Sequence, residues 1–120
     1  MPSAVIYVKD LAPMQAFYER VAKLPVVEAT DEYVEMDDLL LVAIPPEIAE
    51  TFDIADPPIR REDASVKLVF DVPVLAAARV RASQLGGVLD PAETEWEFGA
   101  FRVCDGHDPE GNPLQLREPT

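Results

Sequence analysis

The sequence has only one cysteine, one histidine and one tryptophan among its 120 residues. A single cysteine cannot form an intramolecular disulfide, and nothing in the sequence indicates an oxidising compartment. No apolar run approaches the roughly 20 residues that a membrane-spanning helix needs. The first residues also lack the basic region and long apolar stretch of a secretory signal. We therefore expect a cytoplasmic protein.

Basic residues are scarce as well: 10 Lys and Arg stand against 23 Asp and Glu, which gives a net charge of −13. Nucleic acids are bound through clustered basic residues that contact phosphates, so this composition argues against a nucleic-acid partner. An acidic surface is also repelled by anionic membranes. It keeps a protein soluble, and it can steer a cationic small molecule towards a site.

The hydrophobic residues make up 48% of the chain and extend over its whole length, which is enough for one domain with a real core. Two segments read alike, AVIYVKDLAPMQAFYERVAKLPVVE from position 4 and VKLVFDVPVLAAARVRASQLGGVLD from position 66. Asp10 aligns with Asp71 at an offset of 61 residues, and Val8 aligns with Phe70 at an offset of 62. The chain therefore reads as a tandem duplication of a β-α-β unit.

Local chemistry predicts one helix in each half of the chain. Asp10 can cap the first helix, and Pro13 falls in its first turn, where a missing N–H costs nothing. The second helix is expected to have Pro73 near its first position and Gly86 just after its end. The first helix carries an apolar stripe at helical spacing, formed by Met14, Phe17, Tyr18 and Val21. Short runs of β-branched and aromatic residues predict strands in 26–29, 33–37, 39–44, 88–89, 96–104 and 114–117.

The expected organisation is a single domain, 1–120, that contains two modules. Module one covers 1–45 and module two covers 64–120. The segment 46–63 between them contains prolines that argue against a continuous strand, although Glu47–Phe52 can form a helical turn. We take this segment as the linker.

These features resemble the vicinal oxygen chelate superfamily, which includes glyoxalase I, bleomycin-resistance proteins, extradiol dioxygenases and fosfomycin-resistance enzymes. The resemblance covers nearly the whole chain and rests on the doubled β-α-β-β-β order, on VKDLAPMQAFYERV and on DPEGNPLQL. It implies an α+β fold of tandem βαβββ modules, with an open U-shaped mixed sheet, helices outside and a ligand cavity within. Because the edges of an open sheet need cover, it also implies a homodimer.

Strand alternation divides the residues of three strands between the helices and the cavity. The side chains expected to face the helices are Ala4, Ile6, Val8, Val66, Leu68, Phe70, Leu114 and Leu116. Those expected to face the cavity are Ser3, Val5, Tyr7, Ser65, Lys67, Gln115 and Arg117.

Metal-dependent members of the superfamily carry His, Gln or Glu ligands on the first and last strand of each module. The resemblance places Ser3, Ser65 and Gln115 at three of these positions, and the fourth falls in LLLVAI, which holds no ligand. Serine hydroxyls are poor ligands for these metals, and one amide cannot hold an ion. We therefore expect no metal and no cofactor, with Gln115 hydrogen-bonded to a bound molecule or to a neighbouring strand.

A displaced metal site around His107, the only histidine, remains open, because Asp105 and Asp108 are close in sequence. The alternative is an exposed turn in which His107 is solvated and Asp108 bonds the backbone of its own turn. Cys104 is expected to be a small buried hydrophobic residue rather than a nucleophile.

Without a metal, the resemblance points to bleomycin-resistance-type proteins, which bind a ligand without chemistry. Alternation along 96–104 puts Trp96 and Phe98 on one face and Phe101 on the other, unless Gly99 bulges the strand. A planar ligand can stack on Trp96, which otherwise serves core or dimer packing. Lys67 and Arg117 suit a carboxylate or phosphate unless they pair with Glu35 or Asp37, so the sign of the ligand stays open. The predicted ligand-binding residues are Tyr7, Tyr33, Glu35, Lys67, Trp96, Phe98, Gln115 and Arg117.

The predicted function is metal-free binding of a small molecule, for sequestration, as in antibiotic resistance, or for sensing. The alternative is a metal-dependent lyase, isomerase or dioxygenase with displaced ligands. A metal-free enzyme that uses Glu35, Lys67 or Tyr7 as acid or base is a third hypothesis. A module that serves only protein interaction is a fourth. The sequence leaves open whether the chain is an enzyme.

Overall fold

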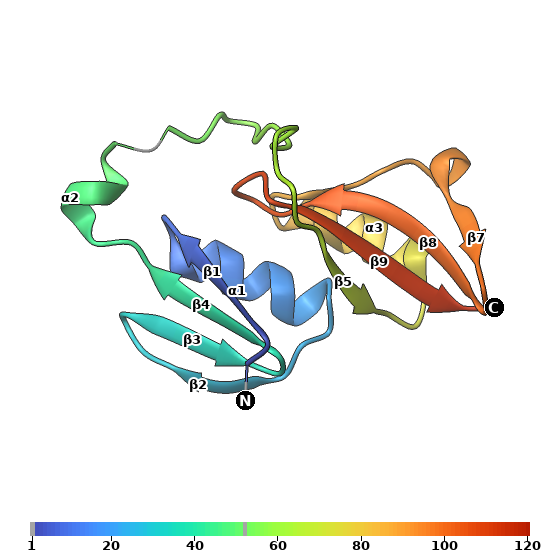
Figure 1. The fold of residues 1–120 in the computed structure, drawn as a ribbon, viewed down its shortest axis with the longest axis horizontal. Coiled ribbons are helices and arrows are strands. Elements are labelled where there is room, and N and C mark those ends of the chain that lie inside the picture. Colours follow the sequence, from blue (N-terminus) through green and yellow to red (C-terminus); the bar gives the residue numbers. More distant parts are fainter. Residues whose placement is uncertain (1, 52) are drawn as a thin grey trace.

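The computed structural model describes residues 2–51 and 53–120, and its strands form two mixed sheets that lie side by side (Figure 1). The first sheet has the order β1-β4-β3-β2, and the second has the order β5-β9-β8-β6 with β7 also paired to β8. The strands of the first sheet are β1 Ala4–Val8, β2 Val26–Ala29, β3 Tyr33–Met36 and β4 Leu39–Ala43. The strands of the second are β5 Leu68–Asp71, β6 Val88–Leu89, β7 Trp96–Phe98, β8 Phe101–His107 and β9 Pro113–Pro119.

The two sheets repeat one pattern of pairing. In each, the strand before the long helix pairs in parallel with the last strand of the repeat, β1 with β4 and β5 with β9, while the remaining pairs are antiparallel. The helices are α1 Leu11–Arg20, α2 Pro46–Ala49 and α3 Leu75–Gln84, with a 3₁₀ turn at Ala92–Thr94. Helices α1 and α3 lie on one side of the sheets and contact each other, which leaves the opposite face open (Figure 1). This confirms the predicted α+β fold class.

The core lies between the two long helices and the sheets. The predicted stripe of α1 is buried at Met14, Phe17, Tyr18 and Val21. It packs in one cluster with Leu39 and Leu41 of β4 and with Leu114 and Leu116 of β9. Among the described residues no helix has the length and apolar character needed to cross a membrane.

The starts of the two helices differ from the prediction. Asp10 occupies the N-cap position of α1 but makes no side-chain cap hydrogen bond there. Helix α3 begins at Leu75, so Pro73 lies outside it, because Val74 is still extended with φ −145° and ψ 117°. The end of α3 is as predicted, since Gly86 follows with φ +89°, a conformation that favours glycine.

The alternation of side chains holds along β1, where Val5 and Tyr7 are exposed and Val8 is fully buried. It also holds along β9, where Leu114 and Leu116 are buried. Val66 departs from the prediction, because β5 begins only at Leu68 and the Val66 side chain is 69% exposed instead of facing the helices. Ile6 and Leu68 pack against the core as predicted, and they also border the cavity described below.

The segment predicted as one strand, 96–104, is a hairpin. Gly99 adopts φ +60°, and the tight turn at Gly99 and Ala100 pairs Phe98 directly with Phe101. Directly paired residues of antiparallel strands share a face of the sheet. Phe101 therefore lies on the same face as Trp96 and Phe98, which corrects the predicted separation.

Candidate ligand-binding site

The turn between β8 and β9 joins the second sheet to the helix of the first. Asp108 in this turn is fully buried and accepts a hydrogen bond of 2.7 Å from the Tyr18 hydroxyl on α1. It also accepts the backbone N–H groups of Glu110 and Asn112 at 2.9 and 3.0 Å, as predicted for this turn. Burial raises the pKa of Asp108, and the hydrogen bonds from Tyr18 and Asn112 oppose that rise. Burial beside this carboxylate also raises the pKa of Tyr18 well above its usual value.

Glu110 of the same turn supplies the helix cap that Asp10 does not. Its carboxylate accepts the backbone N–H groups of Lys9 and Asp10 at 2.9 Å, at the first turn of α1. A carboxylate at a helix N-terminus is favoured by the unpaired N–H groups and by the helix dipole. Burial raises the pKa of Glu110, and the backbone hydrogen bonds from Lys9 and Asp10 oppose the rise.

The linker packs onto this turn at Gly111. Gly111 has φ +84°, and a Cβ there would lie 2.3 Å from the carbonyl oxygen of Ile59, so only glycine fits. The backbone N–H of Arg61 donates to the Gly111 carbonyl at 2.9 Å. The neighbouring Arg60 side chain pairs with Asp90 at the end of β6. The linker is thereby held against the second sheet where it passes the turn.

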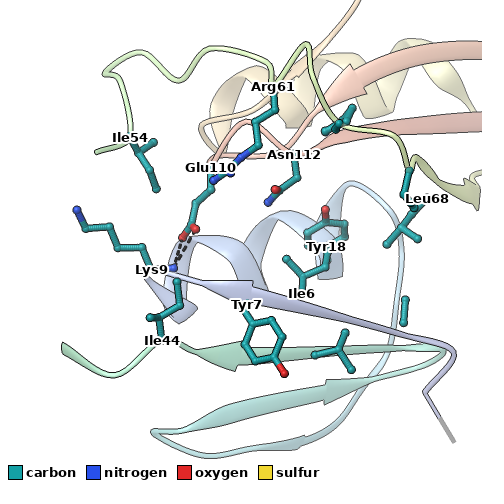
Figure 2. Close-up of a pocket in the computed structure, with 15 residues that line it drawn as sticks. Ile6, Tyr7, Lys9, Tyr18, Ile44, Ile54, Arg61, Leu68, Glu110 and Asn112 are labelled. Carbon is teal, nitrogen blue, oxygen red and sulfur yellow. Dashed lines mark hydrogen bonds between the residues drawn. The ribbon is translucent and has the colours of Figure 1, made fainter. Parts of the chain in front are cut away.

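A partly open cavity of about 450 Å³ lies at the seam between the two sheets, lined by β1, the linker, the start of β5 and the β8–β9 turn. We call it the seam cavity. Its apolar wall includes Ile6 of β1, Ile54 of the linker and Leu68 of β5. Figure 2 shows Arg61 and Glu110 on the side of the linker and the turn, opposite Tyr7. An apolar wall with few polar groups is typical of small-molecule sites, and the volume falls within their usual range.

The predicted ligand-binding residues are spread over the open face rather than gathered in this cavity. Tyr7 lines the seam cavity and is 69% exposed. Tyr33 and Glu35 line a separate hollow on the first sheet. Trp96 and Phe98 lie on β7, which pairs with β8, so β8 and β9 separate them from β5.

The two basic residues among the predicted ligand-binding residues, Lys67 and Arg117, both form ion pairs with acidic residues of the second half of the chain. Lys67 lines a hollow next to the seam cavity and forms an ion pair with Asp105, Nζ to Oδ1 3.1 Å. Arg117 pairs with Asp71, Nε to Oδ1 2.7 Å, and its guanidinium lies 4.2 Å from the centre of the Phe101 ring. The predicted pairing partners, Glu35 and Asp37, are not the ones used here.

Gln115 is hydrogen-bonded to the neighbouring strand, one of the two outcomes predicted for it. Its side-chain amide donates to Asp105 Oδ1 at 3.1 Å, the same oxygen that pairs with Lys67. The residue of β5 that is paired with Gln115, on the same face of the sheet, is Val69. An ammonium group already neutralises the one carboxylate at this position, and valine offers no ligand atom. These residues do not fit the divalent ion that the fold family implies.

The expectation of an exposed turn with a solvated His107 is wrong for His107. His107 is only 6% exposed rather than solvated, and its Nδ1 lies 2.9 Å from the carbonyl oxygen of Asp108. The Asp108 carboxylate accepts hydrogen bonds from the backbone of its own turn and from the Tyr18 hydroxyl. Cys104 is fully buried, as predicted, and burial raises the pKa of its thiol. Across 2–51 and 53–120, no cluster of three or more His, Cys, Asp or Glu residues is placed to hold a metal ion.

Five polar residues of the seam cavity are absent from the predicted ligand-binding residues: Lys9, Tyr18, Arg61, Glu110 and Asn112. Arg61 belongs to the linker, which carries no strand periodicity and was read only as a connection. The DPEGN turn was recognised as a motif, and its glycine and acidic residues were the available signal. Nothing local indicates that this turn reaches α1, because Glu110 and Lys9 are 101 residues apart.

No protein-family model matches the sequence, and no curated protein matches it either. Solved structures do match. A glyoxalase/bleomycin resistance protein/dioxygenase family enzyme from Burkholderia phytofirmans is similar with a TM-score of 0.65 and 20% identity, over 98% of this chain and 96% of the other. The fosfomycin resistance protein FosX from Listeria monocytogenes, in complex with Mn(II) and dihydroxypropylphosphonic acid, is similar with a TM-score of 0.63 and 13% identity, over 100% and 92%.

Lactoylglutathione lyase from Agrobacterium tumefaciens is a third similar structure, with a TM-score of 0.54 and 20% identity, over 98% of this chain and 92% of the other. At these identities the likeness shows the fold alone. The chain therefore has the fold of these glyoxalase/bleomycin-resistance proteins, and its function must be argued from its own residues.

Proposed function

We propose that the chain is a metal-free binding protein that holds a small molecule in the seam cavity, for sequestration or sensing. The observation that carries this proposal is the cavity itself: about 450 Å³, with apolar side chains from both sheets and a few polar groups on one side. Sites of this kind bind ligands by burying an apolar body and orienting it with a few hydrogen bonds.

The metal-dependent alternative is disfavoured by the chemistry of the donors. Ser3 is exposed, and its hydroxyl is directed to Asp38 at 3.5 Å. Gln115 and Lys67 share the Asp105 carboxylate. The last strand of the first sheet, β4, offers only leucine, valine and alanine side chains. A similar solved structure contains Mn(II), but the residues that this structure describes at these positions do not gather the hard or borderline ligands that such an ion needs.

The hypothesis of a metal-free enzyme is disfavoured by how the ionisable lining residues are used. Tyr18 and Glu110 line the seam cavity and have raised pKa values, which is a feature of many catalytic groups. Both are committed to the structure, however: the Tyr18 hydroxyl donates to Asp108, and the Glu110 carboxylate accepts the backbone N–H groups of Lys9 and Asp10, just before α1. Groups that are held in this way support a binding role better than proton transfer.

A fluorescence titration tests the proposal. Phenylnaphthylamine (NPN), a neutral aromatic fluorophore, should bind saturably to chelator-treated protein with an increase in its emission. Ala64 is exposed and lines the seam cavity, so Ala64→Trp should fill the cavity without disturbing the core and weaken NPN binding at least roughly tenfold.

The matched control is Ala55→Trp, because Ala55 is an exposed alanine of the linker, which precedes Ala64, and does not line the seam cavity. It should bind NPN as the wild type does. Equal affinities of the two tryptophan variants would show that the fluorophore binds elsewhere, and no saturable binding to the wild type would overturn the proposal.

A further inference from the structure

We infer that the seam cavity selects organic anions, molecules with an apolar body and one oxyanion group, and that Arg61 is the residue that recognises the anion. The inference rests on the proposed function and names the ligand class of the same site. It assigns a role to the linker, which supplies Arg61 and the apolar Ile54 to the cavity.

Two cations close to Arg61 in the sequence are already engaged in ion pairs. Arg60 pairs with Asp90, and Lys67 pairs with Asp105. The side chain of Arg61 makes no hydrogen bond or ion pair with the residues that the structure describes, although it lines the seam cavity. A guanidinium carries five N–H donors in a planar fork, which matches the two oxygens of an oxyanion.

Glu110, the acidic residue that lines the cavity with Arg61, does not accept hydrogen bonds from the Arg61 guanidinium. Both carboxylate oxygens of Glu110 accept backbone N–H groups of Lys9 and Asp10 at 2.9 Å. Arg61 acts on Glu110 only through its charge, which opposes the rise in the pKa of that carboxyl. The negative charge of Glu110 also disfavours a second charge on the ligand, so a singly charged anion is favoured over a doubly charged one.

The backbone of Arg61 is held in place before any ligand arrives. Its backbone N–H donates to the Gly111 carbonyl at 2.9 Å, and the preceding residue, Arg60, is fixed by its pair with Asp90. A ligand then has only the Arg61 side chain to order, which lowers the entropy cost of binding. The wall beside it, with Ile54 and Leu68, suits an apolar body.

The net charge of −13 makes the inference easy to test, because most of the surface repels anions. Anilinonaphthalene sulfonate (ANS) has the same aromatic body as NPN with one added sulfonate. In the wild type, ANS should bind more tightly than NPN. Arg61→Gln should weaken ANS binding roughly tenfold or more and change NPN binding less than about twofold, because charge-assisted hydrogen bonds to the sulfonate are lost.

Two further variants complete the design. Arg20→Gln removes the same charge from the exposed end of α1, outside the cavity lining, and should leave both affinities unchanged. Arg61→Lys keeps the charge without the planar fork and should restore part of the ANS affinity. Circular dichroism of each variant establishes that it is folded.

The outcomes separate the two proposals. Equal ANS affinities of the wild type and Arg61→Gln, with NPN still bound in the cavity, would overturn the anion inference and leave the proposed function standing. If neither fluorophore binds saturably to the wild type, the proposed function itself fails. An equal loss of ANS and NPN binding in folded Arg61→Gln would assign Arg61 to the shape of the cavity and would also overturn anion recognition.

Discussion

Asp108 is fully buried, and its carboxylate accepts hydrogen bonds from the Tyr18 hydroxyl and from the backbone and side-chain amides of Asn112. These donors come from two parts of the chain, α1 and the β8–β9 turn. A buried carboxylate is tolerated only when such donors replace the water that it has lost. The side chain therefore connects the two halves of the fold. Its removal should lower the stability of the protein rather than change its affinity for a ligand.

We predict that Asp108→Asn lowers the free energy of unfolding by about 3 kcal/mol, because an amide offers one acceptor oxygen and turns an NH₂ group towards donors. The melting temperature should fall by roughly 10 °C or more. Asp105→Asn is the matched control, since Asp105 is partly exposed and bonded to Lys67 and Gln115. Asp105→Asn should lower the free energy of unfolding by about 1 kcal/mol or less. Urea unfolding measures both, and equal losses would contradict the role given to Asp108.

At the scale of elements, Glu95 connects the 3₁₀ turn Ala92–Thr94 to α3 and to β8. Its carboxylate pairs with Arg79 of α3 and with Arg102 of β8, the latter at 2.6 Å. Burial alone would raise the pKa of Glu95, but the hydrogen bonds from Arg79 and Arg102 outweigh it and lower the pKa. A lowered pKa means that the folded state favours the charged carboxylate and binds its proton less readily than the unfolded chain does.

The stability that Glu95 contributes is therefore present above the ordinary glutamate pKa of about 4.3 and is lost as the pH falls through the lower, folded-state value. We predict that Glu95→Gln is less stable than the wild type at pH 7 and that the difference narrows below about pH 4. The raised pKa values of Asp108 and Glu110 act in the opposite sense, but they are common to both proteins and cancel in the difference. A difference that is constant with pH in urea unfolding would contradict the assigned ion pairs.

The elements themselves were largely predictable, because they depend on neighbours in sequence. The apolar stripe of α1 and the stop at Gly86 follow from local spacing and backbone preference, and both are as predicted. What could not be predicted depends on contacts between distant segments. Glu110 caps α1 from the other half of the chain, and the pairing of Phe98 with Phe101 depends on a turn that sequence alternation cannot place.

The candidate site was predictable only in part, for the same reason. Alternation placed Tyr7 on the correct face of β1, and the structure adds that it lines the seam cavity. Arg61 was missed because its position is set by the packing of an irregular linker on Gly111. Residues of irregular segments carry no periodicity from which a direction can be read.

At the scale of the whole molecule, two sheets share their helical layer and leave one broad face open (Figure 1). Apolar side chains are exposed, among them Tyr7 and Phe98. The homodimer stays a prediction, and it would cover surface of this kind. The seam cavity lies where the two sheets meet, so the proposed binding function depends on the whole chain rather than on either repeat.

The central claim is that binding depends on the side chains of this chain and not on a metal. The measurement that tests it most directly is the melting temperature of chelator-stripped protein, recorded by calorimetry alone and with Mn²⁺, Ni²⁺, Zn²⁺ or Fe²⁺. An ion present at 100 times its Kd would add about 2.7 kcal/mol, or several degrees for a domain of this size. We predict an unchanged melting temperature with every ion. A rise of several degrees with any one of them would contradict the claim and favour a metal-dependent enzyme.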